Sequence, residues 1–174
     1  MPNHCFNNLS ITGPQKDLRA FMKKAKGPNG LIDFNKFIPY PKKFKEMDEF
    51  AQKMRERCDK LCKKEKNEKM RERIRAKFGN IRDGYNMGGY DWCCHNWSTK
   101  WNAYEITEWN ISKGVITITF DTAWGTPYNV FIVISKQFPT LKLINEYEVE
   151  GNGGGTERFY QGLELYRPIS AVRS

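Results

Sequence analysis

The most regular alternation in the sequence is Val115-Ile116-Thr117-Ile118-Thr119-Phe120-Asp121-Thr122. Its apolar side chains occupy every second position, which is the period of a strand with one buried face. The segment before it, Lys100 to Trp109, alternates in a similar way, and Asn110 to Gly114 carries turn residues. Together these segments predict an antiparallel β-hairpin.

Segments on both sides of this hairpin predict further strands and two helices. Strand patterns occupy residues 3–12, 141–148 and, as an edge strand, 157–166. Helical patterns occupy residues 15–26 behind Pro14 and the segment from Thr126-Pro127 to about Phe138. Pro near the first helical position and Thr just before it are typical of a helix start.

The order of these elements is βαββαβ once residues 43–78 are set aside. This order predicts a ferredoxin-like α+β fold, in which an antiparallel sheet carries its helices on one face. The name describes topology and implies no iron–sulfur cluster. A chain of 174 residues is expected to form a single domain over residues 1–174.

Residues 43–78 have a different composition. They hold 14 Lys and Arg against 8 Asp and Glu, which is +6 of the chain's net charge of +9. Apolar residues recur every three or four positions on both sides of residues 64–68, so we expect an inserted basic helical hairpin, with one long projecting helix as the alternative.

The charges of this segment fit either a solvated helix face or a surface for a polyanion or a partner. A further interpretation is that the segment forms a dimer contact through Met54, Cys58 and Leu61, and the sequence leaves the oligomeric state open. The candidate basic arm comprises Lys53, Arg55, Arg57, Lys60, Lys63, Lys64, Arg71, Arg73 and Arg75.

The stretch Tyr90 to Trp101 contains three of the chain's five tryptophans, two cysteines and a histidine. We expect it to follow a loop over residues 79–89 and to lead into the second strand. Its tryptophans either fill the core or form an exposed cleft that anchors a partner. The candidate cleft residues are Trp92, Asn96, Trp97, Lys100, Trp101 and Trp124.

Catalytic and cofactor chemistry finds little support in the residue pattern. Zinc sites usually separate paired cysteines by two or more residues, and Cys93 and Cys94 are adjacent. Neighbours on a strand point to opposite faces, which disfavours a reactive pair with His95. The glycine-rich residues 151–155 precede a strand pattern and are expected to form a turn rather than a phosphate loop. We therefore expect no metal, cofactor or catalytic site.

Several motifs lie along the chain outside residues 43–78: Pro2-Asn3-His4-Cys5-x-Asn7-x-Leu9-x-Ile11-x-Gly13, Phe34-Asn35-Lys36-Phe37-Ile38-Pro39, Asn96-Trp97-Ser98-Thr99-Lys100-Trp101, Thr122-Ala123-Trp124 with Pro127, and Phe138-Pro139 with Tyr147. Together they resemble the YubB-like, ferredoxin-fold family of plasmid and phage proteins. His4 stands where the family usually has Trp, and Ser98 where it usually has Gly. The resemblance implies the fold, an intracellular location and a mobile-element origin, and it implies no activity.

The sequence shows no apolar run of membrane-spanning length and no secretory pattern at Met1 to Cys5, so a cytoplasmic protein is expected. The leading prediction is a non-enzymatic accessory protein of a phage or plasmid that binds a host or phage protein, for example in a defence system. The alternatives are nucleic-acid binding through the basic arm, and a small-ligand pocket or enzyme at the tryptophan cleft.

Overall fold

The computed structural model describes residues 3–28, 30–112 and 114–165. The chain divides into two compact units, one made of residues 1–39 with 93–174 and the other of residues 40–92. The first contains a β-sheet and the second is helical. Among the described residues, no helix combines the length and the apolar character needed to cross a membrane.

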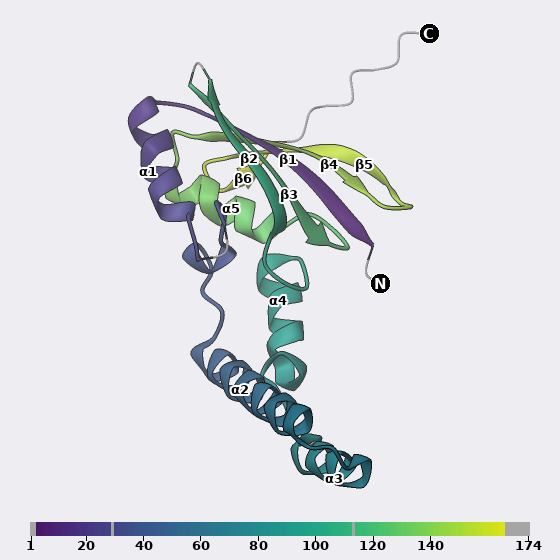
Figure 1. The fold of residues 1–174 in the computed structure, drawn as a ribbon. Helices are drawn as coiled ribbons and strands as arrows, with labels where there is room; N and C mark the ends of the chain where they lie inside the picture. The colour runs from purple at the N-terminus through teal and green to yellow at the C-terminus, as the bar shows by residue number, and fades with distance from the viewer. Residues whose placement is uncertain (1–2, 29, 113, 166–174) are drawn as a thin grey trace. The chain divides into compact units, whose positions relative to one another are not determined.

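Six β-strands form one antiparallel sheet in the described part of the first unit (Figure 1). The order is β2-β3-β1-β4-β5-β6, so the first strand of the chain lies between β3 and β4. The strands are β1 (His4–Thr12), β2 (Tyr104–Ser112), β3 (Val115–Ala123), β4 (Lys142–Val149), β5 (Gly153–Tyr160) and β6 (Leu163–Glu164).

The helices α1 (Gln15–Ala25) and α5 (Tyr128–Gln137) cover one face of this sheet (Figure 1). The apolar side of the strand alternation is buried beneath them, as shown by Phe120 of β3, whose ring lies 6.5 Å from that of Phe131 in α5. Burial of these side chains is the main favourable contribution to folding. The predicted ferredoxin-like α+β fold with helices on one face is confirmed.

Pro39 and Pro41 predict an extended connection over residues 31–41 that lies across the core, but the observed segment is not extended throughout. It contains the 3₁₀ turn η1 (Phe34–Lys36), which the Asp33 side chain caps by accepting a hydrogen bond from the Asn35 backbone N–H at 3.0 Å. Short polar side chains such as Asp favour local turns of this kind. The apolar pattern of residues 31–41 predicts three anchors: Phe34 and Phe37 are buried, as predicted, whereas Ile38 is only half-buried.

The second unit is built on α2 (Lys42–Lys64) and α3 (Glu68–Phe78), with the break between them where the sequence predicted it. The Asn67 side chain caps α3 by accepting from the Met70 backbone N–H at 3.4 Å. The Asp48 carboxylate accepts hydrogen bonds from the Tyr40 hydroxyl at 3.1 Å and from the Tyr85 backbone N–H at 2.8 Å. These bonds hold Tyr40, which precedes α2, and the segment after α3 against the same side chain of α2.

The prediction for residues 79–101 is wrong in part: residues 79–83 form a loop, but helical segments follow it. The expected loop ends in a helical turn, η2 (Tyr85–Gly89), and the expected entry to a strand is the helix α4 (Tyr90–Trp97). The second strand begins at Tyr104 rather than Lys100. The glycines of residues 79–89 allow close packing as well as turns: a Cβ on Gly84 would lie 2.6 Å from the Phe44 Cα.

Several element ends also differ from the prediction. The second strand continues to Ser112, where a turn was expected. Pro127, rather than Thr126, stands at the N-cap of α5, because the Thr126 hydroxyl donates to Glu157 instead. The expected edge strand over 157–166 begins earlier and is interrupted by a turn before β6; residue 166 lies outside the described residues.

Candidate functional site

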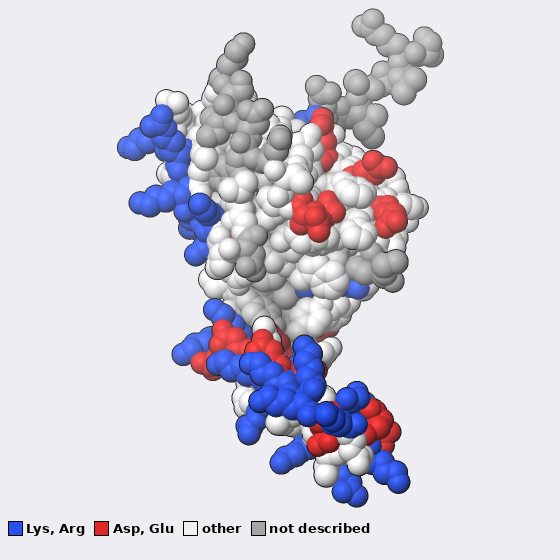
Figure 2. All heavy atoms as spheres, viewed as in Figure 1, with Lys and Arg blue, Asp and Glu red and all other residues white. Residues whose placement is uncertain are grey.

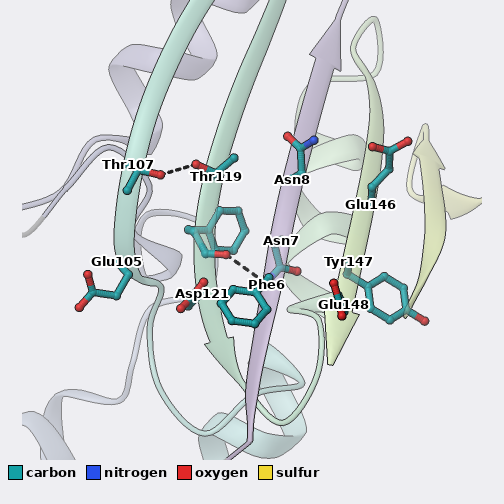
Figure 3. Close-up of a pocket in the computed structure, with 11 residues that line it drawn as sticks. Phe6, Asn7, Asn8, Glu105, Thr107, Thr119, Asp121, Glu146, Tyr147 and Glu148 are labelled. Atoms are coloured by element: carbon teal, nitrogen blue, oxygen red, sulfur yellow. Dashed lines mark hydrogen bonds between the residues drawn. The ribbon is translucent and has the colours of Figure 1, made fainter. Parts of the chain in front are cut away.

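The face of the sheet opposite α1 and α5 carries the polar side of the strand alternation. It is hollowed over about 550 Å³ (Figure 3). The side chains that line the hollow come from four strands and include Phe6, Asn8, Glu105, Asp121, Glu146 and Glu148. We call this surface the open face.

Phe6 is the large apolar side chain of the open face and is 51% exposed. Strand register places it directly opposite Asp121 of β3 on one side and Glu148 of β4 on the other. Neighbouring strands lie about 4.8 Å apart, so the two flanking strands are about 10 Å apart. A phenyl ring therefore stands between two carboxylates (Figure 3).

A β-bulge brings a further carboxylate to the hollow. The register of β2 against β3 shifts between Tyr104 and Glu108, and Glu105 adopts a left-handed backbone with φ of 48°. Bulges re-aim side chains, and a non-glycine residue in this conformation costs about 1–3 kcal/mol. Here the bulge leaves both Glu105 and Thr107 lining the hollow, where the Thr107 hydroxyl pairs with that of Thr119.

The charges on this face interact with one another. Burial raises the pKa of Asp121, and the negative charge of Glu105 raises it further, whereas His4 opposes the shift. The Asp121 carboxylate lies 3.7 Å from His4 Nδ1, which is also 2.9 Å from the Tyr104 hydroxyl. Acidic side chains gather over these strands (Figure 2), so the open face attracts cations.

Three of the predicted cleft residues come together beside this face. The Lys100 ammonium lies 2.9 Å from the ring centre of Trp124 and 5.7 Å from that of Trp101. Trp124 is 50% exposed and Trp101 is 36% exposed. The Trp101 ring is 6.4 Å from that of Tyr104, so exposed aromatic surface continues from the tryptophans toward His4 and the open face.

The other predicted cleft residues lie elsewhere. Trp97 is buried, donates its indole N–H to the Ile38 carbonyl at 2.9 Å and packs edge-to-face on Phe34. Trp92 belongs to the unit of residues 40–92, where its ring meets Tyr40 at 5.6 Å. Asn96 is half-buried on α4.

The segment that joins α4 to β2 holds an unusual backbone. Ser98 has a φ of 63°, in the left-handed region that Gly adopts most easily, and Gly is the residue that the resembled family usually has at this position. Two neighbours hold the turn in place: the Ser98 hydroxyl accepts from the Asn129 backbone N–H at 3.3 Å, and the Thr99 hydroxyl donates to the Ala123 carbonyl at 2.9 Å.

Cys93, Cys94 and His95 lie on a helix, so the argument that placed them on a strand does not apply. Cys93 is buried, while the His95 carbonyl accepts from the Asn129 side-chain amide at 2.8 Å. Within the described ranges, three or more His, Cys, Asp or Glu side chains are nowhere grouped to hold a metal ion.

The predicted basic arm lies on α2 and α3. Arg55 pairs with Asp83, and the Glu68 carboxylate accepts from Arg71 at 2.9 Å and from Arg75 at 3.1 Å. These pairs occupy three of the nine candidate cations. The exposed cations of the arm for which the described residues show no ion pair are Lys53, Arg57, Lys60, Lys63, Lys64 and Arg73 (Figure 2).

A buried polar network crosses the helix-covered side of the sheet, and no residue pattern predicts it. The Asn145 side-chain amide donates to Asn7 at 3.1 Å and to Glu157 at 3.4 Å. The Thr126 hydroxyl donates to Glu157 at 2.8 Å. Burial raises the pKa of Glu157 and raises the pKa of the nearby Cys5 thiol to about 11, so this thiol is an inert core residue.

Sequence reasoning also missed Phe6, the exposed ring that lines the hollow. One signal was present: Phe6 shares the polar side of its strand with Asn8 and Ser10, where an aromatic residue is out of pattern. The carboxylates opposite it lie more than a hundred residues away in sequence, and their register is visible only in the sheet.

Comparison with known proteins supports the fold. Residues 96–168 match a family model described as the ferredoxin-like domain in Api92-like protein. A crystal structure of the protein api92 from Yersinia pseudotuberculosis is similar, with a TM-score of 0.54 and 11% sequence identity over 93% of this chain and 95% of that one. At this identity the likeness concerns the fold alone. No curated protein matches the chain.

Proposed function

We propose that this chain is a non-enzymatic binding protein that presents the open face of its sheet to a cationic segment of a partner protein. The observation that carries the proposal is Phe6, half-exposed in a hollow and flanked by Asp121 and Glu148. Aromatic residues within a polar rim are the usual anchors of protein interfaces. The surrounding carboxylates steer positively charged partners to the face.

In this proposal the partner is a host or phage protein, and the chain acts in the host cytoplasm as an accessory protein of a phage or plasmid. Modulation of a host defence system is one role of this kind. The resemblance of Asn96-Trp97-Ser98-Thr99-Lys100-Trp101 and of the N-terminal motif to the YubB-like family supports the mobile-element origin.

The proposal is tested with a short labelled peptide rich in lysine and arginine, titrated with the wild-type chain and with the double variant Asp121→Asn/Glu148→Gln. Exposed ion pairs contribute about 0.2–1 kcal/mol each, so we expect the double variant to bind roughly 2- to 30-fold more weakly. Asp17→Asn, on α1, is the matched control, since its side chain can still accept from Thr140. Equal affinity of the double variant and the wild type would refute the role of the open face.

A second candidate function is nucleic-acid binding by the basic arm. It is favoured by the six exposed cations on α2 and α3 that have no ion pair within the described chain. Phosphate contacts would make the affinity fall steeply with salt and leave it independent of base sequence. Titration of labelled DNA and RNA at two salt concentrations, with Lys60→Gln/Lys63→Gln/Lys64→Gln as the variant, tests this. Absence of binding at low salt excludes it.

A small-ligand or enzymatic site at the tryptophans receives less support. It required Trp92, Trp97, Trp101 and Trp124 to wall one pocket. Trp97 instead fills the core beside Phe34, and the Lys100 ammonium lies over the Trp124 ring.

A further inference from the structure

The Phe6 ring forms one wall of the hollow in the open face. Its neighbour on the same side of β1, His4, stacks against it with ring centres 6.4 Å apart and planes at 18°. The half-exposed ring is also one of the side chains that line the hollow (Figure 3). The hollow therefore offers a flat aromatic surface beside carboxylates from β3 and β4.

The arrangement selects a particular kind of cation. A guanidinium group is planar, stacks on aromatic rings and directs its N–H donors sideways toward carboxylates. The strands that carry Asp121 and Glu148 are about 10 Å apart, a span that a guanidinium group fills together with charge-assisted hydrogen bonds of about 2.8 Å on each side.

We infer that the open face binds an arginine side chain of its partner, with the guanidinium stacked on Phe6 and hydrogen-bonded to Asp121 and Glu148. The inference rests on the proposed function and names the group that this function recognises. The hollow of about 550 Å³ is larger than one side chain, so residues beside the arginine also fit. Glu105, Glu146 and the Thr107–Thr119 hydroxyl pair are their contacts.

Other ligands suit the hollow less well. Methylated lysine is usually held in a cage of several aromatic rings. Phe6 is the ring that projects from the open face into the hollow, because Phe120 is buried and the half-buried Tyr147 alternates with Glu146 and Glu148 to the other side of β4. An unmodified lysine is a point charge and gains less from a flat ring and two separated acceptors. Nucleic-acid phosphates are repelled by four carboxylates.

The experiment is a titration followed by amide chemical shifts, using a blocked pentapeptide with one central arginine and the same peptide with lysine or citrulline in its place. We expect shifts centred on β1, β3 and β4, with arginine bound several-fold more tightly than lysine and citrulline bound most weakly. Citrulline keeps the planar shape and removes the charge, so it separates stacking from ion pairing.

Phe6→Leu keeps an apolar side chain and removes the flat ring. We expect this variant to bind the arginine peptide 2- to 5-fold more weakly, as expected for an exposed cation–π contact, and to lose most of the preference over lysine. Phe50→Leu is the matched control, because Phe50 is 56% exposed on α2. Dispersed amide spectra of both variants show that they fold.

The outcomes separate the two proposals. Equal binding of arginine and lysine, with no effect of Phe6→Leu but weaker binding by the Asp121→Asn/Glu148→Gln variant, overturns the arginine inference and leaves the cationic partner in place. No shifts on the open face with any cationic peptide overturn both. Arginine preference that depends on Phe6 supports both.

Discussion

Replacement of Trp97 tests whether this residue, at the end of α4, belongs to the core or to the surface. The indole donates its N–H to the Ile38 carbonyl at 2.9 Å, lies edge-to-face on Phe34 at 5.9 Å and is 4% exposed. Truncation of a buried Trp costs about 3–5 kcal/mol, so Trp97→Ala should lower the free energy of unfolding by this amount. Trp97→Phe retains the ring but leaves the Ile38 carbonyl without its donor, which costs about 1–3 kcal/mol.

The control is Trp124→Ala, because this side chain is 50% exposed and contacts the Lys100 ammonium. An exposed cation–π contact contributes about 0.5–1 kcal/mol, so the loss should stay below about 1 kcal/mol. Urea unfolding followed by far-UV circular dichroism measures all three variants without relying on tryptophan fluorescence. If Trp97→Ala costs no more than Trp124→Ala, Trp97 is a surface residue and a tryptophan-walled cleft becomes the better interpretation.

Two further predictions concern burial and close packing. Burial raises the pKa of Glu157 above its usual value, so the folded chain holds this proton more tightly than the unfolded chain, and stability is lost as the pH rises through the folded pKa. The Glu157→Gln variant, whose amide oxygen can still accept from Thr126, should therefore gain stability relative to the wild type as the pH rises from 4 to 7. Urea unfolding measures this, and a difference in the free energy of unfolding that stays constant over this pH range would contradict it. Gly84→Ala would place a Cβ 2.6 Å from the Phe44 Cα and should destabilise the helical unit by about 1–3 kcal/mol, whereas Gly125→Ala, with no atom within 4 Å of the new Cβ, should be nearly neutral in thermal unfolding; equal melting temperatures would contradict it.

The strands of the sheet were predictable because the same pattern that sets their propensity also sets their burial. Ile116, Ile118 and Phe120 are all buried against the helices, and the alternate positions face the open side. Local preference and tertiary packing agree at such positions, which is the condition under which a pattern identifies an element.

At α4, local preference and tertiary packing disagree. Residues 90–97 are rich in Trp, Tyr and Cys, which favour strands or are neutral, and their glycine-rich approach resembles a turn. The helix is favoured by contacts that no local pattern shows, such as Trp97 on Phe34 and on the Ile38 carbonyl. Tertiary packing overrides weak propensity here, as it does in α5 with its β-branched residues.

The neighbours on the open face could not be predicted from the sequence even if every strand were known. Alternation alone places Phe6, Asp121 and Glu148 on the polar side of their strands, but it leaves open which residues are neighbours. A slip of two residues in the β1–β3 pairing would keep every side chain on its face but would place Thr119 or Ala123, instead of Asp121, opposite the ring. The observed register sets all three side by side, and the bulge at Glu105 adds a fourth group that no regular strand would deliver. Recognition of a guanidinium group therefore depends on register, and a variant that shifts the register of β3 by two residues should abolish arginine preference while leaving the fold and the total charge of the face intact.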